Sequence, residues 1–171
     1  MYLGFISLGS TLLGGQLTKN TSTLAPANSD AVPTFRVYGP SGLMTGGTGS
    51  AALKDTGSIT GASNANPIVI TSAAHGLTNG TRVTITGVGG NTNANTTATV
   101  ANKTTDTYEL ASVAGNGAYT SGGTWNVTGL YKFEVACTAG NGYASGATYT
   151  ALLSWAVSSV QQQELHTFTV V

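Results

Sequence analysis

Residues 66–92 read NPIVITSAAHGLTNGTRVTITGVGGNT, and residues 108–125 read YELASVAGNGAYTSGGTW. Both segments consist of short β-branched runs separated by Gly- and Asn-rich turns, a pattern typical of strands joined by tight connections. Residues 82–86 alternate strictly, so Val83 and Ile85 project to one face and the polar side chains to the other. These segments predict a compact β-module in the middle of the chain.

Turn residues separate the strands of this module. Asn79-Gly80 tolerates the positive φ of a hairpin turn and precedes the strand at 82–86. We place the limits of the module at residues 58 and 128. Five strands are predicted within it, at residues 67–71, 82–86, 97–100, 107–110 and 124–127.

Strands are also expected on both sides of the module. Residues 33–38 alternate, with Phe35 and Val37 facing inward, and residues 2–18 supply one or two further strands. Residues 45–50 are rich in Gly and Thr and are predicted to form a connector. No window has a sustained helical period, so an all-β chain is predicted. Three strands follow the module, at residues 130–137, 148–157 and 165–171.

The alternation also predicts which side chains are buried. In the outer strands these are Phe35, Val37, Phe133, Val135, Tyr149 or Leu153, Trp155 and Phe168. In the central module they are Ile68, Ile70, Val83, Ile85, Tyr108, Leu110 and Trp125.

The central segments ITSAAHGLTNGTRVTITGVGGNT, TDTYEL and GNGAYTSGGTW, in this order, resemble a small β-barrel-like module of bacteriophage virion proteins. That module is similar to the FCCH domain, first described in the catalytic-cysteine half of ubiquitin-activating enzymes. The pattern HGL-x-NG-x-R-V at residues 75–83 is its most specific part. The resemblance implies a fold; it carries over no adenylation or thiol chemistry, because no matching catalytic residue is present.

The outer segments AVPTFRVYGPSG, GLYKFEV, SGATYTALLSW and HTFTVV resemble an immunoglobulin-like sandwich common in phage structural proteins. The chain departs from antibody domains because it has no Cys pair, and only Trp155 could serve as the core tryptophan. Together the two resemblances imply an all-β chain. An immunoglobulin-like β-sandwich, residues 1–57 and 129–171, would be interrupted by a small inserted β-barrel-like module, residues 58–128.

The composition is unusually poor in charge. Charged residues make up 7% of the chain and the formal net charge is zero, against about 25% charged residues in a typical soluble domain. Such a surface favours a protein docked in an assembly, with a secreted β-protein as the alternative. The six basic residues are scattered, so no nucleic-acid partner is expected. The apolar start is short and interrupted by Gly, so no membrane span is expected.

Residues capable of chemistry are few and dispersed. The single cysteine, Cys137, shares parity with Phe133 and Val135, which predicts a buried, inert thiol. His75 and His166 fall in different modules, and no spacing brings the six carboxylates together. We therefore expect no catalytic residue, no cofactor and no metal site, and we predict that the protein is not an enzyme.

Three non-enzymatic functions remain open. The first is a capsid decoration (cement) protein, present in many copies or as a homo-oligomer on the head shell and bound to the major capsid protein or other virion proteins. The second is a tail, neck or fibre component of the virion. The third is a glycan-binding β-module for host attachment. We favour decoration, with assembly in the host bacterial cytoplasm, because the chain is short and has no fibre repeat or coiled coil.

Two surfaces are candidates for these contacts. The apolar start offers Tyr2, Leu3, Phe5 and Ile6 as an assembly contact. We expect this stretch to pair with its own sandwich as a first strand and to carry the contact on its other face. For a glycan, the candidates are Tyr119 and Tyr143, with Trp125 as a third aromatic residue.

Overall fold

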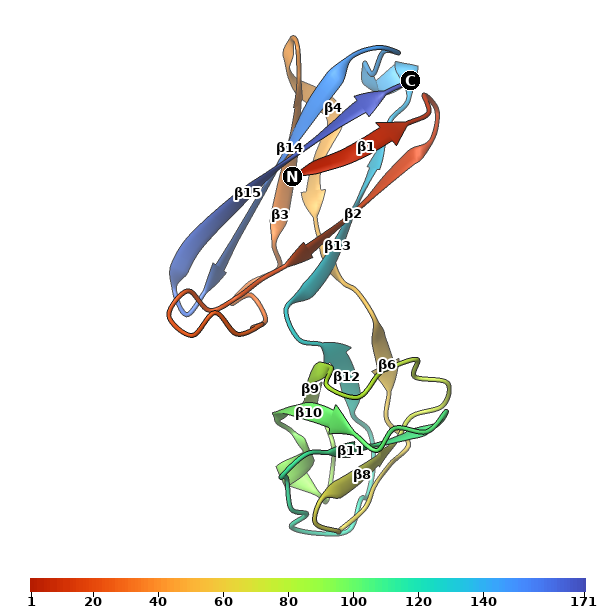
Figure 1. Ribbon diagram of the computed structural model, residues 1–171, viewed down its shortest axis with the longest axis vertical. Helices are drawn as coiled ribbons and strands as arrows, with labels where there is room; N and C mark the ends of the chain where they lie inside the picture. The colour runs from red at the N-terminus through yellow and green to blue at the C-terminus, as the bar shows by residue number, and fades with distance from the viewer. The chain divides into compact units, whose positions relative to one another are not determined.

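The computed structural model describes residues 1–171 and is all-β, as predicted (Figure 1). Its only helical elements are two single 3₁₀ turns, η1 (Thr92–Ala94) and η2 (Ala139–Asn141). The chain divides into an outer unit, Met1–Ala52 with Gly129–Val171, and an inserted unit, Leu53–Thr128. Each unit has its own hydrophobic core.

The outer unit is a β-sandwich of one five-stranded and one three-stranded sheet. The larger sheet has the order β1 (Tyr2–Ile6), β15 (Val160–Val170), β14 (Thr148–Val157), β3 (Thr34–Gly39) and β4 (Gly42–Ser50). The smaller sheet has the order β2 (Thr11–Leu17), β13 (Leu130–Ala136) and β5 (Ala52–Leu53). In Figure 1 the red β1 runs beside the blue β15, with which it pairs in parallel.

This strand order is that of immunoglobulin-type sandwiches. There the strands lie in the orders G-F-C-C′ and B-E-D, which here correspond to β15-β14-β3-β4 and β2-β13-β5. A further marker is a tyrosine near the start of strand F whose hydroxyl bonds the backbone a few residues upstream. Tyr149 fulfils this description, because its hydroxyl accepts a 2.7 Å hydrogen bond from the backbone N–H of Ala144.

The sandwich core contains every side chain predicted for it. All of the predicted outer core residues are buried, and both alternatives at Tyr149 and Leu153 point inward. On β3, where antibody domains carry their core tryptophan, Phe35 packs against Phe133 with ring centroids 5.5 Å apart. Trp155 is buried on β14 instead. The core is thus built without a disulfide, around aromatic rings contributed by both sheets.

The inserted unit contains a single curved sheet of seven strands. Its order is β6 (Thr56–Ser58), β12 (Thr124–Val127), β9 (Arg82–Thr86), β10 (Thr97–Ala101), β11 (Thr107–Leu110), β8 (Ile68–Thr71) and β7 (Gly61–Ala62). All seven residues predicted for this core are buried. The predicted barrel does not close, because β6 and β7 remain separate edges. These two edge strands follow each other along one segment of the chain. Between them, the backbone N–H of Ile59 donates to the carbonyl oxygen of Gly123, and that of Thr60 donates to the carbonyl oxygen of Thr71.

The inserted unit begins earlier than the predicted residue 58. β6 pairs antiparallel with β12, with Thr56 opposite Asn126. The backbone N–H of Val127 also donates to the carbonyl oxygen of Asp55 at 3.0 Å. Residues 55–57 therefore belong to the inserted unit, and its incoming and outgoing segments run side by side.

Candidate functional site

The first strand of the outer unit carries the predicted assembly contact. β1 pairs with β15, and Leu3 and Ile6 pack against the sandwich core. Tyr2 and Phe5 point outward and are 52% and 69% exposed. Of the four predicted contact residues, two therefore anchor the strand and only two can meet a partner.

A bulge explains why Tyr2 and Phe5 share a face although they are three residues apart. The register with β15 shifts between them, and Gly4 has a φ of +97°. The two rings meet edge to face, with centroids 6.0 Å apart. A bulge also blunts an edge against strand addition. The strand thus offers side chains, rather than open backbone, to a partner.

The neighbouring strands extend this surface with uncharged side chains. Leu165 is 55% exposed and lies opposite Leu152, which is half-buried. Thr167 and Thr169 pair with Tyr2 and Phe5. We define the β1 patch as Tyr2, Phe5, Leu152, Leu165, Thr167 and Thr169. None of its members is charged.

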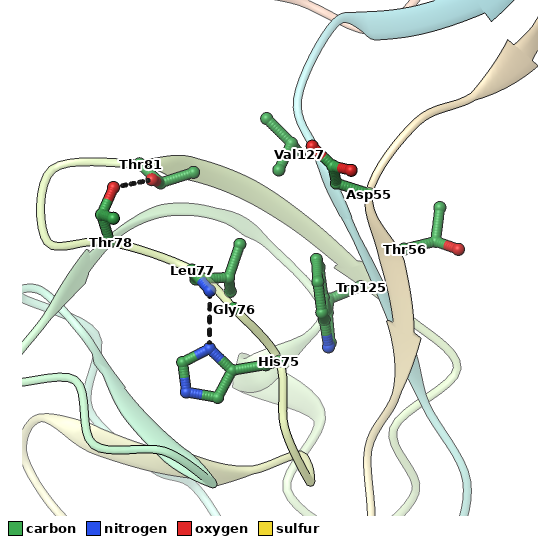
Figure 2. A pocket seen from close by; sticks show the side chains of 9 residues that line it. All are labelled: Asp55, Thr56, His75, Gly76, Leu77, Thr78, Thr81, Trp125 and Val127. Carbon is green, nitrogen blue, oxygen red and sulfur yellow. Dashed lines mark hydrogen bonds between the residues drawn. The ribbon is translucent and has the colours of Figure 1, made fainter.

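A second candidate site is a hollow of about 470 Å³ in the inserted unit. Figure 2 shows its lining, which is Asp55, Thr56, His75, Gly76, Leu77, Thr78, Thr81, Trp125 and Val127. The HGL motif supplies one wall, while β12 and the segment that enters β6 supply the other. A motif that the resemblance marked as specific thus forms part of a recess.

The histidine of this motif is fully engaged. The backbone N–H of Leu77 donates to His75 Nδ1 at 3.0 Å, so this nitrogen carries a lone pair. His75 Nε2 lies 3.2 Å from the carbonyl oxygen of Thr107 and must donate to it. The ring is therefore held as the neutral Nε2–H tautomer, with no nitrogen left for a substrate or a metal.

The other polar groups of the hollow are also paired, with few exceptions. The indole N–H of Trp125 donates to the buried hydroxyl of Ser72 at 2.8 Å. The hydroxyls of Thr78 and Thr81 bond each other at 3.1 Å. The carboxylate of Asp55 has no partner, and in Figure 2 it turns towards the Val127 side of the hollow. The free carboxylate of Asp55 and the half-buried side chain of Val127 are what this recess offers to a ligand, because Leu77 and Trp125 are only 5% and 3% exposed.

The structure contradicts the predicted glycan contacts, because their aromatic side chains are buried or half-buried. Tyr143 is only 2% exposed because its ring packs against Tyr149 and Phe168 in the sandwich core. Tyr119 is half-buried, and its hydroxyl donates to backbone oxygens of the inserted unit. Trp125 is 3% exposed. None of the three presents a free aromatic face to a sugar ring.

The remaining groups with chemical potential lie inside the sandwich. His166 is fully buried, and its Nε2–H donates to Gln16 Oε1 at 2.8 Å. Gln16 in turn donates to Glu164 at 2.9 Å, which forms a polar link between the two sheets. Burial lowers the pKa of His166, and the Glu164 carboxylate partly opposes this shift. Burial also raises the pKa of the Cys137 thiol, whose sulfur faces the carbonyl oxygen of Val135.

Sequence signals could have found part of this arrangement. His75 was visible as part of the HGL motif, whereas nothing in the sequence distinguished Asp55 from the other carboxylates.

No helix of the structure has the length and apolar character needed to cross a membrane.

Comparisons with known proteins add little to this description. No protein-family model matches the chain, and no curated protein matches it. A phage phi92 endosialidase is 16% identical, with a TM-score of 0.30; the match covers 95% of this chain and 26% of that one. A family 123 glycoside hydrolase from Clostridium perfringens is 7% identical, with a TM-score of 0.26; the match covers 98% and 22%. This chain spans about a quarter of either protein, and at these TM-scores the likeness carries no argument.

Proposed function

We propose that this chain is a non-enzymatic structural protein of a bacteriophage particle, bound to the head shell as a decoration protein through the β1 patch. The observation that carries the proposal is the outward pair Tyr2 and Phe5. They are large, exposed aromatic side chains on a strand that its own anchors, Leu3 and Ile6, hold in place.

The surface chemistry supports a permanent assembly role. Interface centres are depleted of charged residues and enriched in aromatic residues. The β1 patch has this composition, and the chain as a whole is 7% charged. Many copies docked on a shell would cover such a surface, with the major capsid protein as the partner. The phage setting itself comes from the two resemblances of sequence.

The histidines and the cysteine are either bonded within their unit or buried, which supports a role without chemistry. Both nitrogens of His75 are bonded within the inserted unit. His166 and Cys137 are completely buried in the sandwich. The two histidines also belong to different units.

Two matched substitutions test the proposal. Phe5→Thr removes an aromatic ring from the β1 patch, and Leu13→Thr removes an equally exposed apolar side chain from β2, since both residues are 69% exposed. Threonine suits an exposed strand position, so both variants should fold. Loss of a hot-spot aromatic residue costs about 2 kcal/mol or more, which corresponds to about 30-fold weaker binding.

The assay is the number of copies per purified particle when each variant is produced during infection. We expect strong loss of incorporation for Phe5→Thr and little change for Leu13→Thr. Equal incorporation of both variants and the unaltered chain would refute the β1 patch as the contact. An image of the particle then separates the locations: density on the shell supports decoration, and density confined to the tail, neck or fibres refutes it.

A further inference from the structure

The carboxylates of this chain are almost all satisfied internally. Five of the six accept hydrogen bonds from, or pair with, other groups of the chain: Asp30 with the N–H groups of Ser158 and Ser159, Asp106 with Ala74, Glu109 with Asn102, Glu134 with Lys132 and Glu164 with Gln16. Asp55 is the sixth, and it lies at the hollow of Figure 2. The one unpartnered carboxylate is therefore an exposed group at the edge of a recess.

The backbone of Asp55 is held in place. Asp55 has a φ of +53°, a left-handed conformation that costs energy in residues other than glycine. Its carbonyl oxygen is tied to the N–H of Val127 at 3.0 Å. The backbone position from which this side chain projects is therefore set before a ligand binds.

We propose that this hollow binds a basic side chain, lysine or arginine, presented by a partner protein. The cationic end would pair with the carboxylate of Asp55. The aliphatic stem would lie along Val127, the half-buried apolar side chain of the lining, while Leu77 and Trp125 form the floor beneath it at 5% and 3% exposure. This site lies in the inserted unit and is separate from the β1 patch of the outer unit.

The paired state of the lining excludes a sugar as the better ligand. A saccharide needs several donors and acceptors at once, because each of its hydroxyls loses water on binding. The nitrogens of His75 and the indole N–H of Trp125 are already bonded, and the hydroxyls of Thr78 and Thr81 bond each other. A basic side chain needs one anionic partner and apolar contact along its stem, which matches the groups that remain.

The experiment is an NMR titration of the full-length ¹⁵N-labelled chain with short blocked peptides. The probes are Ac-Gly-Lys-Gly-NH₂, its arginine counterpart and a neutral norleucine counterpart of the same length, with methyl glucoside as a fourth probe. The reporters are the backbone N–H of Val127 and the indole N–H of Trp125. We expect saturable shifts with the lysine or arginine peptide, with a Kd of about 1–10 mM, and weaker binding at high salt.

Asp55→Asn is the test variant and Glu109→Gln the control. Both remove one negative charge from the inserted unit, and asparagine tolerates the same backbone conformation. We expect Asp55→Asn to weaken peptide binding at least about fivefold, within the range of a charged pair, and Glu109→Gln to leave it unchanged. Equal shifts with the norleucine peptide, no effect of Asp55→Asn, saturation by the glucoside alone, or no saturable shift at all would each overturn the proposal. Because the isolated chain is used, the outcome is independent of incorporation into particles.

Discussion

Gly14 on β2 offers the sharpest test of how the sandwich is packed. A Cβ added at Gly14 would overlap Cε1 and Cζ of Phe133. That ring is 1% exposed and is enclosed by Phe35 and by His166, with ring centroids 5.5 and 5.9 Å away. Gly14→Ala therefore forces this ring to shift against its aromatic neighbours and should strain the core.

The neighbouring glycine provides the control. A Cβ at Gly15 would meet only the carbonyl oxygen of Tyr131, at 3.9 Å, on the outward face. Replacing glycine by alanine reduces the entropy of the unfolded chain and stabilises by about 0.4–1 kcal/mol where the backbone permits it. This gain is common to both variants, so their difference isolates the overpacking, which costs about 1–3 kcal/mol.

The assay is urea unfolding followed at the indole signal of Trp155, which reports on the outer unit. We expect Gly14→Ala to be less stable than Gly15→Ala by about 1–3 kcal/mol. Adding Phe133→Leu should recover part of this loss, with a coupling energy of about 0.5–3 kcal/mol for residues in contact. Equal stability of the two alanine variants, or strictly additive effects in the double variant, would refute the packing described for this core.

Two further predictions concern polar groups of the sandwich. Because burial lowers the pKa of His166, the unfolded chain binds more protons than the folded one below about pH 6.5, so the stability of the outer unit should fall as the pH is lowered through that value. Urea midpoints at pH 7.5 and pH 5 measure this, and a His166→Gln variant with an equally steep profile would show that another group is responsible. Tyr149→Phe removes the acceptor for the Ala144 N–H and should cost about 1–3 kcal/mol. A change below about 0.5 kcal/mol, the size of a surface substitution, would show that this hydrogen bond contributes nothing to stability.

Period-two alternation was sufficient to predict most strands and both cores. It failed at β4, residues 42–50, which was expected to be partly a connector because its glycines show no alternation. The pairing with β3 explains this strand: Gly49 lies opposite Phe35, and a Cβ there would lie 2.7 Å from the Phe35 ring. A large aromatic residue on one strand thus requires a glycine on the next, which a pattern within one segment cannot reveal.

The candidate sites were predictable only in part. Alternation alone would place Leu3 with Phe5, but the bulge at Gly4 places Phe5 with Tyr2. Tyr143 belongs to a loop, where no period indicates burial, and tertiary packing against Tyr149 decides its position. Asp55 differs from the other five carboxylates in having no partner within the chain, and the sequence does not reveal this difference. These features depend on contacts between distant segments rather than on local pattern.

The pairing of β6 with β12 has a consequence for the entropy of folding. β5 and β13 belong to one sheet, yet residues 54–129 separate them along the chain. A flexible loop of that length would make their meeting unfavourable, since each doubling of length costs about 0.6 kcal/mol. In the folded inserted unit, Thr56 lies opposite Asn126, so the effective loop is only a few residues long. The loop length is thus halved about four times, which lowers the entropic cost of closing the loop by about 2–3 kcal/mol. The inserted unit thus acts on the sandwich as a short connection, and its own stability should influence how readily the smaller sheet assembles.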